Sequence, residues 1–264
     1  MGISYCSLAS GSSGNCHLVS SNGKKILVDA GLSGKRIQGR LEDVDFDPKK
    51  ISGIFVTHEH HDHICGVGVL SRRFNLPIYA NAKTWQAMEE KIGNIKAENI
   101  KVFDTRKPVF LGDLKITPYP ISHDAVEPVG YTFQEGNTKI SITTDLGCIE
   151  EGIINEVKDS DLVVLESNHD VNMLKAGNYP YYLKQRILSN RGHLSNEAAG
   201  NVIVELVKNN VKNVLLAHLS KENNFPELAI ITVKKILDSK NISMGKDINI
   251  DLAHRDKVSN LYSF

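Results

Sequence analysis

Four histidines and an aspartate stand close together in the segment Thr57-His58-Glu59-His60-His61-Asp62-His63. In an extended segment, side chains two residues apart face the same way, so His58 and His60 can offer two imidazoles to one metal ion. Asp62 and His63 come where the chain turns into a helix and can offer a carboxylate and an imidazole to a second ion. This donor set suits zinc, manganese or iron. A solvated polar loop is the plainer alternative, and an expression tag is disfavoured because the segment is internal.

Three further candidate ligands, His123, Asp145 and His218, directly follow predicted strands. Strand ends are where an α/β scaffold can gather distant side chains at one edge. Each of the three alone would more often be structural, but together with the histidine segment they complete two coordination sets. Asp145 would bridge, since one carboxylate can supply an oxygen to each ion. The expected metal ligands are His58, His60, Asp62, His63, His123, Asp145 and His218.

The composition is that of an ordinary globular protein of 264 residues with a formal net charge of zero. Any nucleic-acid binding must therefore use a local basic patch. No apolar run is long enough to cross a bilayer, and the start lacks the pattern of a signal peptide. None of the four cysteines forms a C-x-x-C pair, which indicates reduced thiols in a cytoplasmic protein.

Hydrophobic patterning and turn residues predict a series of strands and helices that position these ligands. The expected strands cover 3–8, 17–20, 25–28, 51–56, 78–80, 114–119, 131–134, 139–143, 162–165 and 214–217. The expected helices cover 33–44, 63–74, 84–93, 182–188, 196–207 and a last one opened by Pro226. Hairpin-rich strands followed by helices, in halves of roughly 1–110 and 111–264, predict two packed sheets with helices outside. We expect one domain over residues 1–264.

The ligand pattern, with Asp29 in Leu27-Val28-Asp29-Ala30-Gly31, resembles the metallo-β-lactamase superfamily. Further segments resemble its YycJ/WalJ-type branch: 10–15 (SGSSGN), 166–170 (ESNHD), 179–180 (YP), 192–197 (GHLSNE) and 217–224 (AHLSKENN). The resemblance implies an α/β fold, the αββα sandwich of two mixed β-sheets with helices on the outer faces. It also implies a cytoplasmic 5′→3′ exonuclease that acts on DNA, with links to DNA repair. One departure is His61, where the family more usually has a small residue, and we expect it to face solvent or to support a ligand.

The resemblance also implies the chemistry of the site. Two ions about 3.5–4 Å apart would clamp the attacking and leaving oxygens of a phosphodiester, with a bridging hydroxide as nucleophile. Zinc or manganese is expected, and iron would also fit. Asp29 would fix a histidine tautomer or a helix start. The expected assignment places His58, His60 and His123 on one ion, Asp62, His63 and His218 on the other, and Asp145 on both.

His193 is left over once both ligand sets are full, and it lies just before a helix. In the related ribonuclease Z branch, a histidine at the corresponding place contacts the scissile phosphate and can protonate the leaving oxygen, a role that suits histidine. The alternative is a histidine that caps a helix start. The candidate catalytic residues are thus Asp62, Asp145 and His193. By analogy Glu166 would hydrogen-bond His193 or a ligand histidine, and a structural ion pair is the equal alternative.

The candidate substrate-binding residues are Ser13, Asn15, Lys184, Arg186 and Arg191. The first two lie in a Gly-Ser loop whose backbone N–H groups could meet phosphate, although a plain hairpin turn fits as well. The other three, with Lys175, stand beside Tyr179, Tyr181 and Tyr182, and basic residues interleaved with aromatics suit nucleic acid. A solvated helix face is the alternative. The expected partner is DNA, single- or double-stranded, and the sequence predicts neither a membrane contact nor an oligomeric state.

Three other functions compete with a two-metal phosphodiesterase. The first is a small-molecule metallohydrolase that acts on a thioester, a lactam or a cyclic phosphodiester. The second is a redox di-iron protein, which His60 disfavours because such proteins carry a carboxylate there. The third is a regulatory binder with a degenerate site, which the complete ligand set disfavours.

Overall fold

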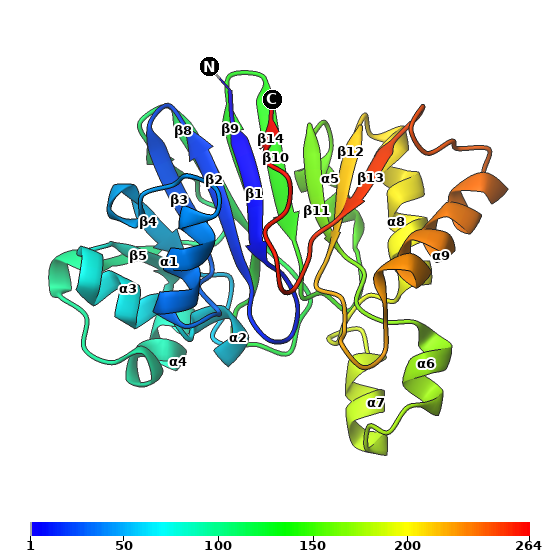
Figure 1. The fold of residues 1–264 in the computed structure, drawn as a ribbon, viewed down its shortest axis with the longest axis horizontal. Helices are drawn as coiled ribbons and strands as arrows, with labels where there is room; N and C mark the ends of the chain where they lie inside the picture. The colour runs from blue at the N-terminus through cyan, green and yellow to red at the C-terminus, as the bar shows by residue number, and fades with distance from the viewer. Residues whose placement is uncertain (1) are drawn as a thin grey trace. The chain divides into compact units, whose positions relative to one another are not determined.

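The computed structural model describes residues 2–264, whose strands and helices are labelled in Figure 1. The strands are β1 (Ser4–Ala9), β2 (Cys16–Ser21), β3 (Lys24–Val28), β4 (Gly53–Phe55), β5 (Ile78–Asn81), β6 (Ile100–Phe103), β7 (Val109–Leu111), β8 (Leu114–Pro120), β9 (Val129–Glu135), β10 (Thr138–Thr143), β11 (Leu162–Glu166), β12 (Asn213–Ala217), β13 (Asn249–Leu252) and β14 (Tyr262–Ser263). They form two seven-stranded sheets, in the orders β14-β1-β2-β3-β4-β5-β6 and β13-β12-β11-β10-β9-β8-β7.

The helices lie in the connections between these strands. They are α1 (Gly34–Glu42), α2 (His61–Ile64), α3 (Val67–Phe74), α4 (Ala82–Ile92), α5 (Glu151–Val157), α6 (Val171–Ala176), α7 (Tyr181–Ile187), α8 (Asn196–Lys208) and α9 (Pro226–Ser239), with 3₁₀ turns η1 (Pro48–Lys50) and η2 (Ala97–Asn99). The predicted elements have counterparts within a few residues of their ends. The short elements β6, β7, α5, α6, β13 and β14 were not predicted, because segments of this length carry little periodic signal.

Both sheets are mixed. In the first, β3 to β6 pair in parallel, whereas β14, β1, β2 and β3 pair antiparallel. The hairpin between β2 and β3 turns at Asn22-Gly23, where φ is 43° and 77°. Two consecutive positive φ angles are what a tight two-residue hairpin turn requires, and Asn-Gly adopts them at low cost. The hairpin predicted at this dipeptide is therefore present.

Contacts between residues divide the described chain into two compact units. The first contains the residues up to Pro120, together with Ala125–Thr138 and His254–Phe264. The second contains Ile121–Asp124 and Lys139–Ala253. The single domain expected over 1–264 stays a prediction.

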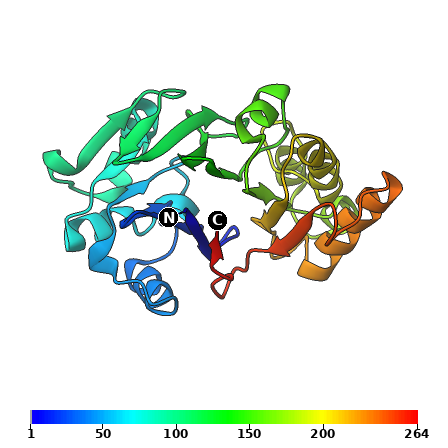
Figure 2. The ribbon, with the colours of Figure 1, turned by 90° about the horizontal axis from the view of Figure 1, so that it is seen from above.

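In the first unit, α1, α3 and α4 cover one face of the first sheet (Figures 1 and 2). The alternation along β4 explains this packing. Ile54 belongs to the core beneath the helices, and Phe55 points to the opposite face. There the Phe55 ring meets Tyr131 of β9 edge-on, with centroids 5.8 Å apart, and the Tyr131 hydroxyl donates to the Val56 carbonyl at 2.6 Å. The first unit is therefore layered: helices lie on one face of the first sheet, and strands of the second sheet, including β9, lie on its other face.

The helix predicted over 63–74 is interrupted, which is a correction to the sequence analysis. Here α2 ends at Ile64 and α3 begins at Val67. Gly66 stands between them, and its N–H donates to the Ala30 carbonyl at 2.7 Å. A β-carbon at Gly66 would lie 2.4 Å from the Leu32 carbonyl oxygen, so this close backbone approach needs glycine.

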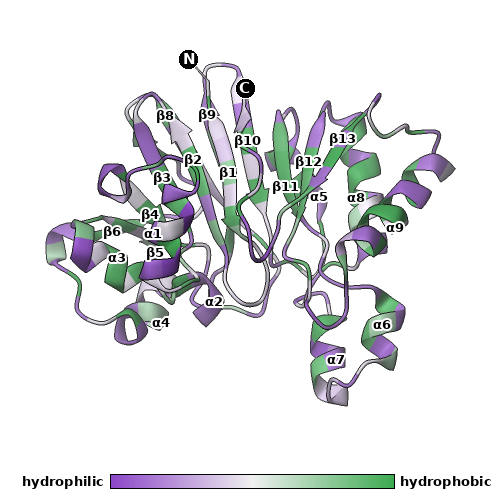
Figure 3. Ribbon diagram, viewed as in Figure 1, coloured by the Kyte–Doolittle hydropathy of each residue, from purple (hydrophilic) through white to green (hydrophobic). Residues whose placement is uncertain are grey.

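In the second unit, β10 to β13 run parallel. All five residues of β11 are buried, and the strand is hydrophobic along nearly its whole length (Figure 3). Such a run is typical of a parallel strand with both faces covered. Helices α8 and α9 cover one of these faces (Figures 1 and 2). Across residues 2–264, no helix combines the length and hydrophobicity needed to span a membrane.

Candidate metal centre

In the first unit, the structure brings three of the predicted ligand histidines together. His58 follows β4 and is fully buried, His60 stands directly before α2, and His63 lies buried within α2. Nε2 of His58 lies 3.1 Å from Nδ1 of His60, and the His58 and His63 ring centroids are 4.0 Å apart. Two imidazole nitrogens this close are stable when they share a proton or direct their lone pairs to one cation. His61 is exposed, as expected.

A buried carboxylate beneath these histidines sets their tautomers. His63 Nδ1 donates to Asp29 Oδ2 at 2.7 Å, and Thr57 donates to the same carboxylate from Oγ1 and from its backbone N–H, each at 2.8 Å. The Thr57 hydroxyl also lies 3.0 Å from His58 Nδ1, where it can accept a hydrogen bond. Burial raises the pKa of Asp29, and its contacts with His63 and Thr57 oppose that rise. Because Nδ1 of each ring is engaged in this way, Nε2 is the nitrogen that His63 and His58 would present to a metal ion.

Asn15 lies beside the predicted ligands of the second ion. It is fully buried, and its Nδ2 is 3.0 Å from His63 Nε2 and 3.5 Å from Asp62 Oδ2. Its backbone N–H donates to the Asp62 carbonyl at 2.8 Å, and its side-chain oxygen accepts from the Gly11 N–H at 2.9 Å. Asn15 therefore holds the Gly-Ser loop against α2, whereas Ser13 of the same loop is exposed.

The second unit gathers the remaining ligands at strand ends. Asp145 follows β10 and His218 follows β12, and both adopt left-handed backbone conformations, with φ of 59° and 56°. Asp29 after β3 does the same, at 61°. This conformation costs about 1 kcal/mol for residues with a β-carbon, and Asp and His are among those that adopt it more often. Nδ1 of His218 is 3.1 Å from Asp145 Oδ1.

Glu166, at the end of β11, joins a predicted ligand to His193. Its Oε1 lies 2.8 Å from Nδ1 of both His193 and His218, and its Oε2 accepts from the N–H groups of Leu146 and Leu194 at 3.0 and 3.1 Å. Burial raises the pKa of Glu166, but the two imidazoles outweigh it and lower the pKa to about 2. The carboxylate is charged, so both Nδ1 atoms donate to it. Of the alternatives for Glu166, the structure thus shows hydrogen bonds to His193 and to a predicted ligand histidine.

Within the second unit, donor atoms of Asp145, Glu166, His193 and His218 all lie within 4.8 Å of one another. His123 stands beside them: its Nε2 is 4.0 Å from Asp145 Oδ1, and its Nδ1 is 3.2 Å from the Gly192 carbonyl. Burial lowers the pKa of His123, which favours the neutral form that binds metals. The donor sets of both units are therefore suited to divalent cations.

Comparison with known proteins assigns the family. The sequence profile of the β-lactamase superfamily domain matches residues 24–219. The exodeoxyribonuclease YycJ of Bacillus anthracis is 43% identical over 250 residues, which cover 95% of each chain. The exodeoxyribonuclease WalJ of Streptococcus pneumoniae is 42% identical over 252 residues, which cover 95% of this chain and 94% of the relative. The chain belongs to the metallo-β-lactamase superfamily.

Solved structures of metallo-β-lactamase fold proteins agree with this assignment. YhfI from Bacillus subtilis has a TM-score of 0.74 and 20% identity, over 98% of this chain and 100% of that one. Zinc-bound PqqB from Methylobacterium extorquens has a TM-score of 0.72 and 14% identity, over 97% of this chain and 99% of that one. These likenesses concern the fold alone. The predicted fold class and the resemblance to the YycJ/WalJ-type branch are confirmed, and the chain is an enzyme of this hydrolase superfamily.

His193 precedes α8, and its side chain is 21% exposed. The neighbouring side chains are less exposed, namely those of His123, Asp145, Glu166 and His218. Its ring centroid lies 5.1 Å from that of His123 and 5.3 Å from that of His218. Ser195, two residues later, caps α8 by accepting from the Ala198 N–H. His193 is therefore not the cap of this helix, and the alternative of a capping histidine is excluded.

The predicted substrate-binding cations make contacts within the second unit. Arg186 Nε donates to the carboxylate of Asp124, and Arg191 Nε donates to the His123 carbonyl at 3.2 Å. Lys184 donates from Nζ to the Lys175 carbonyl at 2.7 Å. The sequence analysis missed Asp124, although it directly follows a predicted ligand. Its Oδ1 is 3.2 Å from His123 Nε2.

Buried amides, which the sequence analysis did not single out, hold these loops together. Asn168 donates from Nδ2 to the His218 carbonyl at 2.9 Å, and Asn224 donates to the carbonyls of Ser167 and Asn168 at 3.0 Å. Asn196, at the start of α8, donates to Asn224 Oδ1 at 3.0 Å. The segments 166–170, 192–197 and 217–224 that distinguished the branch thus meet in one network.

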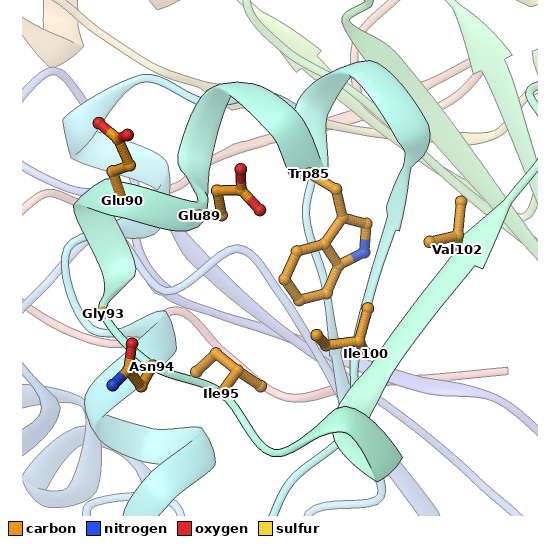
Figure 4. A pocket seen from close by; sticks show the side chains of 8 residues that line it. All are labelled: Trp85, Glu89, Glu90, Gly93, Asn94, Ile95, Ile100 and Val102. Carbon is orange, nitrogen blue, oxygen red and sulfur yellow. The ribbon is translucent and has the colours of Figure 1, made fainter.

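A hollow of about 440 Å³ in the first unit lies away from the histidine segment, between α4 and β6. Trp85 forms part of its wall and donates from Nε1 to the Lys101 carbonyl at 3.2 Å. The lining residues, shown in Figure 4, are Trp85, Glu89, Glu90, Gly93, Asn94, Ile95, Ile100 and Val102. None of them is a predicted ligand, catalytic or substrate-binding residue.

Proposed function

We propose that this chain is a two-metal phosphodiesterase that degrades DNA exonucleolytically from the 5′ end. The observation that carries the proposal is the Glu166 carboxylate, shared between a predicted metal ligand and a histidine outside the ligand set. That pairing gives a hydrolytic site a positioned proton donor in addition to its metal donors. The relatives named exodeoxyribonucleases, 42–43% identical over nearly the whole chain, support the substrate class.

The proposed ligands of the two ions remain those predicted from the sequence, with zinc or manganese as the natural metals and iron as a further option. The residues fit such ions because hydrogen bonds orient their imidazoles: Asp29 fixes His63, Thr57 fixes His58 and Glu166 fixes His218. When bound, the ions would polarise the phosphodiester and lower the pKa of water. His58, His60 and His123 would hold one ion, Asp62, His63 and His218 the other, and Asp145 both.

The protein's own contribution to bond cleavage centres on His193. Its Nδ1–H is held by Glu166, so a proton on Nε2 is the one available for transfer to the leaving oxygen. After the transfer His193 is neutral and still donates from Nδ1, and Glu166 keeps its negative charge throughout. Glu166 does not itself move a proton, because its low pKa leaves it ionised. It acts by orienting the ring through the hydrogen bond that it accepts from Nδ1.

The test is a time course on DNA labelled at the 5′ or the 3′ terminus, single- and double-stranded, with the protein supplemented with zinc or manganese. The expected result is release that begins at the 5′ terminus, stops when the metal is chelated and returns when it is restored. Release that begins at the 3′ terminus, or only at internal sites, would overturn the polarity. Turnover of a thioester or a cyclic phosphodiester with DNA left intact would favour the small-molecule alternative. As part of this proposal, we also infer that the enzyme works in the cytoplasm, where its DNA substrate would be.

A further inference from the structure

Asp124 directly follows the predicted ligand His123, and both belong to the second unit. Its side chain is 24% exposed, but the Oδ1 atom is buried. Oδ1 lies 3.2 Å from Nε2 of His123, whereas Oδ1 of Asp145 lies 4.0 Å from the same nitrogen. The carboxylate outside the predicted ligand set is therefore the closer of the two to this predicted metal-binding nitrogen.

The contacts of the His123 ring determine which of its nitrogens carries a hydrogen. Nδ1 lies 3.2 Å from the Gly192 carbonyl, which can only accept, so Nδ1 is the donor. In the neutral ring Nε2 then carries a lone pair. This nitrogen and Oδ1 of Asp124 are both electron-pair donors, and at 3.2 Å they repel each other unless a cation or a proton lies between them.

The distance between these two atoms matches a shared metal ion. Two donors at neighbouring positions around one tetrahedral or octahedral ion, each roughly 2.1 Å from it, are about 3.0–3.4 Å apart. Nε2 of His58 and Nδ1 of His60, which are proposed to hold the same ion as His123, show a similar separation of 3.1 Å. An imidazole nitrogen and a carboxylate oxygen are also donors that zinc, manganese and iron accept.

Two arginines hold the Asp124 carboxylate in this orientation. Arg186 of α7 donates from Nε to Oδ2, the other oxygen of the carboxylate, and Oδ1 is left directed at His123. Arg191 donates from Nε to the His123 carbonyl at 3.2 Å, which fixes the backbone directly before Asp124. Carboxylates that bind metals usually accept hydrogen bonds of this kind from neighbouring groups.

We propose that Asp124 is a further protein ligand of the metal centre and that its Oδ1 binds the ion held by His123. The inference rests on the two-metal site of the proposed function and adds a carboxylate that the sequence pattern did not include. The additional oxygen shifts the preference of this ion from zinc towards manganese, since carboxylates suit manganese whereas imidazoles suit zinc. Arg186 is then a positioning residue, because it acts on the ion only through Asp124.

The experiment measures the Kd of manganese and of zinc for the full-length protein by competition with a chromophoric chelator. The variants are Asp124→Asn, which keeps the size of the side chain and removes its charge, and Arg186→Ala, which leaves the carboxylate in place. Asp238→Asn, at a side chain of α9 that is 52% exposed, is the control. Circular dichroism and urea unfolding of the metal-free proteins establish that each variant folds. A crystal structure of the metal-loaded parent gives the position of Oδ1.

Asp124→Asn is expected to weaken the binding of one ion by about 100-fold or more, at or beyond the upper end of the range for residues that only support a ligand. The loss should be larger for manganese than for zinc, and the other ion should keep its affinity within about threefold. Arg186→Ala should cost about tenfold, and Asp238→Asn should match the parent. In the loaded crystal, Oδ1 should lie about 2.1 Å from an ion.

A loss in Asp124→Asn no larger than that in Arg186→Ala would make Asp124 a supporting residue and overturn the inference. An Oδ1 atom more than about 3 Å from each ion would also overturn it and would assign the contact with His123 to a shared proton.

Further results separate this inference from the proposed function. If the parent degrades DNA while Asp124→Asn binds both ions normally, Asp124 is not a ligand and the nuclease proposal stands. If the parent binds an ion through Asp124 but degrades no DNA, the nuclease proposal fails and the inference stands. A metal-replete parent that holds no ion at His123 would overturn both.

Discussion

Oε1 of Glu166 lies 2.8 Å from Nδ1 of His193, and Oε2 of the same carboxylate accepts two backbone N–H groups. The two backbone bonds prevent the carboxylate from rotating, so the imidazole always meets the same oxygen. Nδ1 must then carry a hydrogen, and Nε2 is the nitrogen left for chemistry. The orientation of the proposed proton donor is thus determined by the end of β11 and by the loops at Leu146 and Leu194.

Glu166→Gln is expected to lower turnover by about 10- to 100-fold and to weaken metal binding, the usual cost of losing a hydrogen-bonded partner of a metal ligand. Glutamine presents an N–H where Oε1 or Oε2 now accepts, so one of the present bonds must break. Metal content after dialysis and turnover on DNA measure the two effects. Glu227→Gln, an exposed glutamate at the start of α9, is the matched control. Normal values for both quantities in Glu166→Gln would mean that the carboxylate is not needed to orient either histidine.

His193→Ala is expected to keep both metals and to slow cleavage of DNA by about 10²–10⁴-fold, the range for loss of a general acid. A substrate with a p-nitrophenolate leaving group, which needs no protonation, should lose less. Turnover of both substrates and the metal content are measured together. Equal losses on both substrates would indicate that His193 only positions the phosphate. Loss of the metals would place it among the ligands.

Asp145→Ala is expected to abolish turnover and to release at least one ion. The carboxylate lies 3.1 Å from Nδ1 of His218 and 4.0 Å from Nε2 of His123, so it stands among the proposed ligands of the second unit. A methyl group supplies neither its charge nor its two oxygen donors. Metal analysis alongside turnover is the measurement. Near-normal results for both would show that Asp145 does not bridge two ions.

His169 should make the stability of the metal-free protein depend on pH. It is 1% exposed, and burial lowers its pKa from 6.5 to about 4. The unfolded chain takes up this proton near pH 6.5 and the folded chain only near pH 4. The contribution of neutral His169 to the free energy of unfolding is therefore fully present above pH 6.5 and is lost as the pH falls to about 4. The loss is roughly 3 kcal/mol.

Urea unfolding of the metal-free protein at pH 7 and pH 4 measures this dependence. His169→Leu removes the titration, so its stability should fall between the two pH values by roughly 3 kcal/mol less than that of the parent. His61→Leu, at an exposed histidine, is the control and should fall as the parent does. An identical pH dependence for His169→Leu and the parent would contradict the expectation.

The salt dependence of DNA binding should distinguish Lys184 from Arg186. Each phosphate contact on a single strand contributes roughly −0.7 to the slope of log K against log salt. Lys184→Ala is expected to flatten the slope by about that amount. Arg186→Ala should flatten it less, because Asp124 already offsets its charge and raises its pKa. Binding constants over a range of salt concentrations provide the slopes, and equal slopes for Lys184→Ala and the parent would exclude a phosphate contact.

The sequence by itself determined the fold class and most elements that carry the site, because these depend on local patterns. The apolar run of β11 and the Asn22-Gly23 turn each encode their own structure. The spacing of His58, His60 and His63 likewise places three imidazoles together once a strand is followed by a helix start. The distinctive segments also sufficed to identify the family.

Only the tertiary structure decided what each polar side chain contacts. Glu166 follows an apolar strand in the sequence, and nothing local indicates that one of its oxygens is shared by His193 and His218. The same holds for Arg186, whose pairing with Asp124 joins residues 62 positions apart. Such pairings depend on which strand ends and loops meet in space. The physical reason is that local sequence determines backbone conformation, whereas the hydrogen bonds of a buried polar group depend on the packing around it.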